Sequence, residues 1–425
     1  MNESFLHYLW QFQYFDKSEL VTSQGESLSV LKTGILNSNA GPDFFNAKIK
    51  IGDIDWVGNV EIHVKSSDWL AHHHEIDSAY DNVILHLVWE NDKPIFHKNR
   101  ELPTLELKAR VADSIIKEYK RLISNPAAIA CEKSFTKVDP IIKHSMLDKA
   151  LMQRLEIKAN NINELLKINL RDWDETTYQL LARNFGFKIN ADPFFQLSKT
   201  LPYKIIQKQN SLLQVEALLF GQAGILETKT KDEYISLLHR EYHLLAQKYS
   251  LNNSRLNAAQ WRFLRLRPSN FPTLRLSQLA AIVFASKNIF SKLIEVEIYE
   301  SLKKIFEVDQ SDYWKTHYRF GPKAKGAVPK IGESSIENIV INTVVPLLVA
   351  YGKDKDEQRY IDKAVDLLQQ IPAEANKITR TWNELGLSIK NAFDSQALIE
   401  LHNNFCQKRQ CLNCNIGVSI LKPLQ

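Results

Sequence analysis

The sequence has few of the features that mark specialised protein classes. Its 14 Gly and 14 Pro in 425 residues are too few for a fibrous or low-complexity chain. The first residues, MNESFLHYLWQF, lack the basic stretch and the continuous apolar stretch of a signal peptide. The most apolar run, Ile339 to Tyr351, is too short for a membrane span and contains Asn342 and Pro346. These absences predict a cytoplasmic globular protein that does not contact a membrane.

The net charge is small and the cysteines are few. The net charge of +5 permits a nucleic-acid partner but does not require one, because dedicated binders carry a stronger or more local excess. Hydrophobic residues make up 44% and charged residues 24%, and the length allows two or three domains. Four cysteines in a reducing compartment indicate metal or redox chemistry, or unmodified thiols, before disulfides.

The hydrophobic pattern changes near residue 110. Alternation predicts strands over residues 28–31, 44–51 and 56–65, and the continuous apolar run 83–89 predicts a buried strand. A short helix over residues 3–15 precedes these strands, and a helix over residues 69–80 is expected between the third and the fourth. Beyond residue 110 almost only helical periodicity recurs. The sequence therefore predicts an α/β domain over 1–110, in the order helix-strand-strand-strand-helix-strand, and a mostly α-helical domain over 111–425 that ends in a cysteine cluster.

One strand near the amino terminus carries three ionisable side chains on one face. Residues i, i+2 and i+4 of a strand share a face, so Glu61, His63 and Lys65 project together. Asp43 stands at the entrance of the preceding strand. Two carboxylates can hold Mg²⁺ or Mn²⁺, and a cation can stabilise the charge that builds up on a phosphodiester during hydrolysis. The pattern predicts a catalytic site at these four residues; the alternative is a solvated polar face.

The placement of these residues resembles the PD-(D/E)XK nuclease superfamily, whose core has the same order of helices and strands. The resemblance implies a restriction-endonuclease-like core in which Asp43 and Glu61 bind the metal, with Glu3 of the first helix as a candidate addition. His63 stands where the superfamily has Lys. Either Lys65 supplies the cation from the same face, or His63 is itself a ligand or base. An active site and a degenerate one both remain open.

A histidine-rich stretch follows the same strand. In an extended segment His72 and His74 lie on one face, and Asp77 could complete a transition-metal site. His86 interrupts the apolar run 83–89 and would point into the same cleft if that strand neighbours the strand of Glu61. The alternatives are a polar loop and a hydrogen-bonded core histidine. A second metal site at His72, His74 and Asp77 is therefore one hypothesis.

Three of the four cysteines, Cys406, Cys411 and Cys414, lie together near the carboxyl terminus, and Cys131 lies far upstream. Four thiolates are a complete ligand set for Zn²⁺ or for an iron–sulfur cluster. Some nucleases of the PD-(D/E)XK superfamily hold a cluster with one remote and three carboxyl-terminal cysteines, although with a different spacing. The alternative is four reduced thiols that bind nothing.

Between Trp261 and Arg275, arginines alternate with aromatic residues. Guanidinium groups contact phosphates and aromatic rings stack on bases, so the stretch predicts a nucleic-acid contact. The alternative is a packed loop whose arginines pair with Asp or Glu. The candidate contacts are Arg262, Arg265, Arg267 and Arg275.

Over nearly its whole length the sequence is similar to one bacterial family, described as a domain of unknown function, number 2851. The similarity is carried by GPDFFNAKI, GNVEIHVKSSDW, NVILHLVW, WRFLRLRPSNFP and CQKRQCLNCNIG. It transfers no activity, so the function is inferred from the residues.

The resulting hypothesis is a metal-dependent nuclease that hydrolyses DNA or RNA, with Mg²⁺ or Mn²⁺ at the catalytic site and Zn²⁺ or an Fe–S cluster at the cysteines. The helical domain would guide the nucleic acid. One rival is a non-catalytic nucleic-acid-binding protein on a degenerate nuclease fold. The other is a hydrolase of small phosphoesters that uses the histidine cluster.

Overall fold

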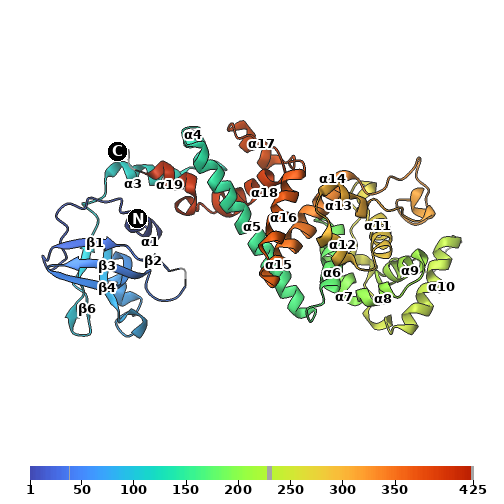
Figure 1. Cartoon of the computed structure of the whole chain (residues 1–425), viewed down its shortest axis with the longest axis horizontal. Helices are drawn as coiled ribbons and strands as arrows, with labels where there is room; N and C mark the ends of the chain where they lie inside the picture. Colours follow the sequence, from blue (N-terminus) through green and yellow to red (C-terminus); the bar gives the residue numbers. More distant parts are fainter. Residues whose placement is uncertain (38, 227–231, 423–425) are drawn as a thin grey trace. The chain divides into compact units, whose positions relative to one another are not determined.

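The computed structural model describes residues 1–37, 39–226 and 232–422. The chain divides into a sheet unit, residues 1–147 with 401–425, and a helical unit, residues 148–400. The predicted boundary at residue 110 follows the change in periodicity. The structural division lies later because helices after residue 110 pack on the sheet together with the carboxyl-terminal segment. Figure 1 shows α19 (Asn415–Leu421, red) beside α3 (Asp113–Ser124).

The sheet unit begins with helix α1 (Glu3–Phe12) and contains one mixed sheet. The strand order is β1-β3-β4-β5-β8, with β2 paired to β3. The pairs β1/β3 and β3/β4 are antiparallel, whereas β4/β5 and β5/β8 are parallel. An α/β start is thereby confirmed. The strands are β1 (Leu28–Lys32), β2 (Ile35–Leu36), β3 (Phe44–Ile51), β4 (Ile54–Lys65), β5 (Val83–Glu90) and β8 (Thr104–Glu106), and β6 (Phe96–His97) pairs with β7 (Arg100–Glu101) in a separate hairpin.

The crossover from β4 to β5 differs from the prediction. The expected helix over 69–80 is confirmed only at its start: the segment forms the short helix α2 (Asp68–Ala71) and the 3₁₀ turn η1 (Ser78–Tyr80). His73 adopts a left-handed backbone with φ of 60°, which ends the helix early. Asp77 then caps η1 by accepting a hydrogen bond from the Ala79 N–H at 2.9 Å. The histidines of this stretch consequently lie on a turn.

The two faces of the sheet are covered differently. Helices α1, α3 (Asp113–Ser124) and α19 (Asn415–Leu421) pack on one face around a large apolar core. The other face carries a small apolar cluster from the crossover and the following segment. Glu61, His63 and His86 are buried on this second face. The small cluster consists of Trp69, Tyr80, Val83, Ile95 and Leu102.

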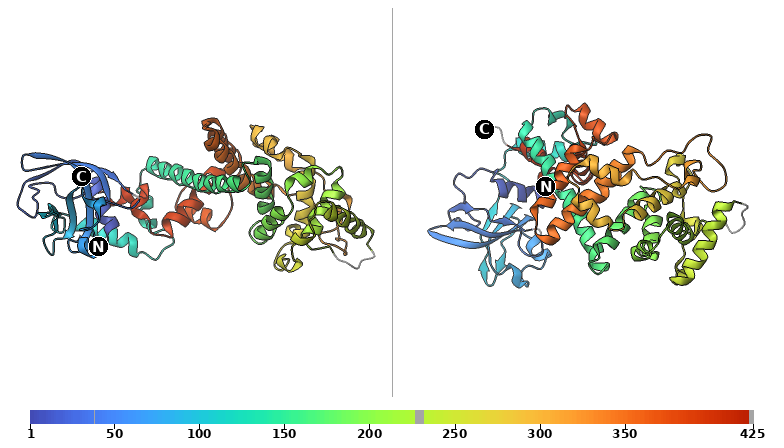
Figure 2. Two further views of the ribbon diagram at one scale, coloured as in Figure 1. Left: turned by 90° about the horizontal axis from the view of Figure 1, so that it is seen from below. Right: turned by 45° about the vertical axis from the view of Figure 1, so that its right-hand side comes forward.

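The helical unit confirms the predicted mostly helical region, and Figure 2 shows its helices from two further sides. Helix α5 (Pro140–Ile168) leads into it. The remaining helices of the chain are α4 (Glu132–Phe135), α6 (Trp173–Phe185), α7 (Ala191–Thr200), α8 (Tyr203–Gln207), α9 (Leu212–Gln222), α10 (Glu233–Lys248), α11 (Pro272–Ala285), α12 (Ile289–Glu295), α13 (Tyr299–Phe306), α14 (Glu333–Ile339), α15 (Val345–Lys355), α16 (Gln358–Gln370), α17 (Lys377–Glu384) and α18 (Ala392–Glu400), joined by the 3₁₀ or π turns η2 (Asn252–Ser254), η3 (Ala258–Gln260), η4 (Pro268–Asn270), η5 (Asp312–Lys315), η6 (Val340–Val344), η7 (Leu401–Cys406) and η8 (Cys411–Asn413).

The apolar run 339–351 belongs to a longer helical segment, Glu333–Lys355, because α14, η6 and α15 are continuous. By length and composition this segment could cross a membrane. However, 72% of its apolar window is buried inside the protein, as in a core helix.

Candidate metal centre

Adjacent strands bring Asp43 and Glu61 together. The Asp43 N–H donates a hydrogen bond to Glu61 Oε2 at 3.1 Å, and the Ile62 N–H donates one to Asp43 Oδ2 at 3.0 Å. The pairing of β3 with β4 shifts register between Phe44 and Ala47, close to this contact. The two carboxylates that the sequence singled out therefore lie side by side.

Four imidazoles gather next to this pair. His63 Nδ1 lies 2.9 Å from His86 Nε2, and His63 Nε2 lies 3.1 Å from His72 Nδ1. Glu61 Oε1 lies 3.4 Å from His74 Nε2 and 3.6 Å from His63 Nε2. In the described part of the chain, His63, His72 and His74 are the one group of at least three His, Cys, Asp or Glu residues whose ligand atoms all lie within 4.8 Å of one another.

Burial dominates the electrostatics of the cluster. It raises the pKa of Glu61 to about 9, with a further contribution from the negative charge of Asp43. It lowers the pKa of His63 to about 3, assisted by His72 and His74, and it also lowers the pKa of His74. Neutral imidazoles keep a free lone pair, which is the form that binds metals.

An aromatic wall encloses the rings. Trp69 is fully buried and meets His74 and His86 edge-on, with both centroid distances at 5.4 Å. Tyr80 stacks on His74 at 3.8 Å. Among the residues that the structure describes, the buried His86 Nδ1 and Trp69 Nε1 have no hydrogen-bond partner. The wall therefore holds the imidazoles mainly by packing.

Helix α1 adds two residues to the carboxylate side. His7 Nε2 lies 3.2 Å from Asp43 Oδ2, although this contact lacks hydrogen-bond geometry. The pKa of Glu3 is raised by burial and then by Asp43, which places Glu3 near the pair. Sequence reasoning named Glu3 and missed His7. The spacing i, i+4 on a helix puts both on one face and could have identified it.

Two of the sequence candidates are exposed and, in the part of the chain that the structure describes, do not bond to the cluster. Lys65 is exposed at the end of β4, and its backbone N–H donates to Asp68 Oδ2 at 2.9 Å. Asp77 is exposed and caps η1. Within the described ranges, neither side chain forms a hydrogen bond or ion pair with the histidines or the carboxylate pair. His63 takes the place beside His72 and His74 that the sequence hypothesis gave to Asp77.

The four cysteines line one cavity of about 20 Å³ in the sheet unit and form no disulfide. Burial, followed by the neighbouring thiols, raises the pKa of Cys131 to about 12 and that of Cys411 to about 11. As far as the structure describes the chain, no three of the thiols lie as close together as the histidine nitrogens. The four cysteines therefore line one cavity, but no three of their sulfur atoms in the described structure lie within 4.8 Å of one another.

Two contacts hold the cysteine segments in place. The Arg409 guanidinium donates hydrogen bonds to the carbonyls of Asn125 at 2.6 Å and Ala127 at 2.8 Å, which draws the carboxyl-terminal loop to the segment before Cys131. At Gly417 a Cβ atom would lie 2.1 Å from the Cys411 carbonyl, so this approach requires glycine.

The predicted arginine contacts separate into two kinds. Arg262, Arg265 and Arg267 are exposed. Arg275 is 4% exposed and donates to Asn270 Oδ1 at 2.6 Å, with further bonds to Gln278 and Ser335. Its prediction as a nucleic-acid contact is corrected, because a buried and bonded guanidinium cannot reach a phosphate.

The fold and the site together define a mixed-sheet unit with a buried histidine–carboxylate cluster, joined to a helical unit. A family model described as "Protein of unknown function (DUF2851)" matches residues 3–377, and the chain belongs to this family. No curated protein and no solved structure matches the chain. These comparisons therefore confirm the predicted family and do not support the resemblance to PD-(D/E)XK nucleases.

Proposed function

We propose that the chain is a metal-dependent hydrolase of nucleic-acid phosphodiesters. One observation carries the proposal: Glu61 Oε1 lies within 3.6 Å of both His63 and His74. The sequence predicts a carboxylate pair and a histidine group as two separate sites, but their side chains lie in one cluster. A mixed set of carboxylate and imidazole ligands next to a water-accessible residue such as His72 is suited to activating water at a metal.

The donor set fits a transition metal better than Mg²⁺. Imidazole nitrogens favour Zn²⁺ and other late transition metals, whereas Mg²⁺ and Mn²⁺ are suited to oxygen ligands, and Mg²⁺ also retains its waters. His63, His72 and His74 would hold the ion together with Glu61. When bound, the ion lowers the pKa of a water molecule and offsets the charge on the reacting phosphate.

The surrounding residues of the chain orient the ligands. The contact of His86 with His63 Nδ1 turns His63 Nε2 towards His72 and Glu61. The Asp43 N–H fixes one oxygen of Glu61, which leaves the other towards the histidines. Asp43 supplies the second carboxylate beside them.

A nuclease-type core is supported by the chain order α1, β1, β3, β4, α2, β5, apart from the two-residue strand β2 and the turn η1, with Asp43 at the entrance of β3 and Glu61 on β4. Two features depart from that superfamily: the crossover helix has only four residues, and His63 occupies the position of its Lys. We therefore propose a histidine-assisted variant of the superfamily's site.

The test is cleavage of labelled DNA and RNA, single-stranded and duplex, in Mn²⁺, Zn²⁺ or Mg²⁺. Asp43→Asn and Glu61→Gln should each lower the rate by at least about 100-fold, since both remove a charge needed at the metal. A wild type that cleaves nothing and binds no divalent metal by calorimetry would favour the degenerate-site rival. Hydrolysis of bis(p-nitrophenyl) phosphate without nucleic-acid cleavage would favour the small-phosphoester rival.

We further propose that the four cysteines bind Zn²⁺ or an Fe–S cluster with a structural role. The support is that all four cysteines of the chain line one cavity although Cys131 is remote in sequence. Arg409 and Gly417 hold their segments together in a way that four unrelated thiols would not need.

A further inference from the structure

Two stretches of the helical unit contain no acidic residue. Residues 242–294 carry eight Lys and Arg, and residues 313–332 carry five, with no Asp or Glu in either. The whole chain has 54 Lys and Arg against 49 Asp and Glu, so the rest of it, with 41 against 49, is acidic. Such local separation of charge is typical of a surface that meets a polyanion.

The two stretches meet at the start of α11. Thr273, in the first turn of that helix, donates a hydrogen bond to the Tyr318 carbonyl at 2.7 Å. The exposed arginines of the first stretch precede this point directly, and Arg319 of the second follows it. This hydrogen bond joins the two acid-free stretches, although Thr273 and Tyr318 are 45 residues apart in sequence.

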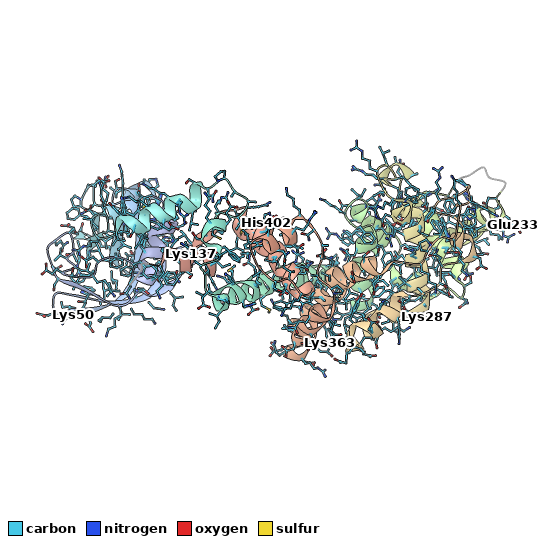
Figure 3. All side chains as sticks on the ribbon, turned by 90° about the horizontal axis from the view of Figure 1, so that it is seen from above. Lys50, Lys137, Glu233, Lys287, Lys363 and His402 are labelled. Atoms are coloured by element: carbon cyan, nitrogen blue, oxygen red, sulfur yellow. The ribbon has the colours of Figure 1, made fainter. Side chains whose placement is uncertain are left out.

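Buried groups fix the backbone of the first stretch. The Asn190 side chain bonds to both the N–H and the carbonyl of Arg262, each at 2.9 Å. Trp261 Nε1 donates to the Ala223 carbonyl at 2.8 Å, and the buried Arg275 reaches Asn270. The side chains of Arg262, Arg265 and Arg267 remain exposed, as does that of Lys287, which Figure 3 labels.

The second stretch is a loop anchored from within. Trp314 is fully buried, Phe320 packs against it at 5.1 Å, and the Gly321 N–H donates to the Tyr313 hydroxyl at 3.0 Å. Ion pairs of Lys315 with Asp312 and of Lys330 with Asp309 lie at its two ends. In the described part of the chain, its exposed cations Arg319, Lys323 and Lys325 form no ion pair.

We propose that these six cations form one surface that binds the phosphodiester backbone of a nucleic acid without reading its sequence. The inference deepens the proposed function, on which its biological role rests, by naming how the substrate is held. Phe263 and Phe271 are half-buried and pack on each other at 5.3 Å, so contact is electrostatic and does not depend on base stacking. The surface consists of Arg262, Arg265, Arg267, Arg319, Lys323 and Lys325.

The test measures binding by the full chain carrying Glu61→Gln, in buffer without added divalent metal, so that cleavage cannot interfere. Fluorescence anisotropy follows labelled 30-mers of duplex DNA, single-stranded DNA and single-stranded RNA over a salt series. One variant replaces the three arginines at 262, 265 and 267 by Ala, and a second replaces Arg319, Lys323 and Lys325. The control replaces Lys377, Arg380 and Lys390, exposed cations at the other end of the unit, at α17 and before α18.

Each surface variant should bind at least about tenfold more weakly at low salt, and the slope of log K against log salt should become shallower by about 2 to 3, because three phosphate contacts are lost. The control should stay within about twofold of its parent, as expected for charges outside the contact. The three substrates then show whether duplex or single strands are preferred.

Surface variants that bind as well as the control would overturn the inference. So would a protein that binds phosphatidylserine vesicles and none of the three nucleic acids. Wild type that binds nucleic acid through this surface yet cleaves none would support the surface and refute the proposed hydrolase, so the two proposals fail separately.

Discussion

The two units place their charged groups in opposite ways. In the sheet unit, Glu61 and His63 are 5% and 1% exposed and touch one another. In the helical unit the side chain of Arg262 is exposed, and hydrogen bonds with the buried Asn190 hold its backbone. A buried cluster depends on each member, because removing one leaves its partners desolvated and unpaired. A surface shares its binding among many contacts, so it should tolerate the loss of any one of them.

The largest effect is expected from removing two nitrogen ligands at once. His72→Ala with His74→Ala should weaken Zn²⁺ or Mn²⁺ binding by at least about 1000-fold, or about 4 kcal/mol, because only His63 and the carboxylates remain. Calorimetry measures the affinity directly. His73→Ala is the matched control, since its side chain lies between the two in sequence and is 75% exposed.

If the double variant keeps its metal affinity, the buried cluster does not depend on each of its members. The difference between the two units proposed above would then be wrong. Loss of affinity in the His73 control would point to collapse of the turn instead. Circular dichroism of both variants separates these outcomes from unfolding.

The cysteine cavity should respond almost as strongly. Cys131→Ser or Cys411→Ser should remove the bound Zn or Fe and lower the free energy of unfolding by about 3 kcal/mol or more, because metal binding is coupled to folding. Elemental analysis of anaerobically purified protein and urea unfolding measure the two effects. Broad absorbance near 400 nm would identify an Fe–S cluster. Metal-free wild-type protein with four reactive thiols would refute the proposal.

Much of the sheet unit follows from local sequence. The alternation in 44–51 and 56–65 and the apolar run 83–89 predicted β3, β4 and β5. Gly52, with φ of 57°, lies in the turn between β3 and β4. The neighbouring strands place His86 opposite Glu61 in the register, as the sequence hypothesis required. These predictions succeeded because strand periodicity fixes which side chains share a face.

The failures concern contacts between segments distant in sequence. No periodicity shows that a left-handed His73 would shorten the crossover helix and carry His74 to Glu61. Arg275 was misassigned because its partners Asn270 and Ser335 come from other turns. The stretch 313–332 has no acidic residue, and the sequence alone shows this. It was missed because the net charge of +5 is a sum over the whole chain, in which the acidic residues elsewhere offset these cations.

A pH experiment tests a buried charge in the helical unit. Glu216 is fully buried and accepts hydrogen bonds from Tyr234 at 2.9 Å and Ser311 at 2.8 Å, beside the anchored loop. Burial raises its pKa from 4.5 to about 7. The unfolded chain therefore loses this proton at lower pH than the folded one, so stability falls as pH rises from about 4.5 to 7 and this loss then levels off.

The loss amounts to about 3 kcal/mol at most, since each pKa unit corresponds to about 1.4 kcal/mol. Glu216→Gln should remove this part of the pH dependence in urea unfolding. Glu233→Gln, at the exposed start of α10 (Figure 3), should retain it. Parallel pH profiles for wild type and Glu216→Gln would show that Glu216 does not titrate differently in the two states.

The smallest effect is expected at Lys65, and it decides whether Lys65 or His63 has the cationic role in the proposed hydrolase. Lys65 shares a strand face with Glu61 but is exposed at the end of β4, whereas His63 is buried beside His72. In water an exposed ammonium interacts weakly with a charge beyond hydrogen-bond distance.

Lys65→Ala should therefore slow cleavage by less than about threefold and leave metal affinity unchanged. His63→Ala should lower both, because it removes a ligand. If Lys65→Ala instead slows the reaction about 100-fold at unchanged metal affinity, the cation acts from Lys65, as the nuclease resemblance implies, and His63 serves the metal alone.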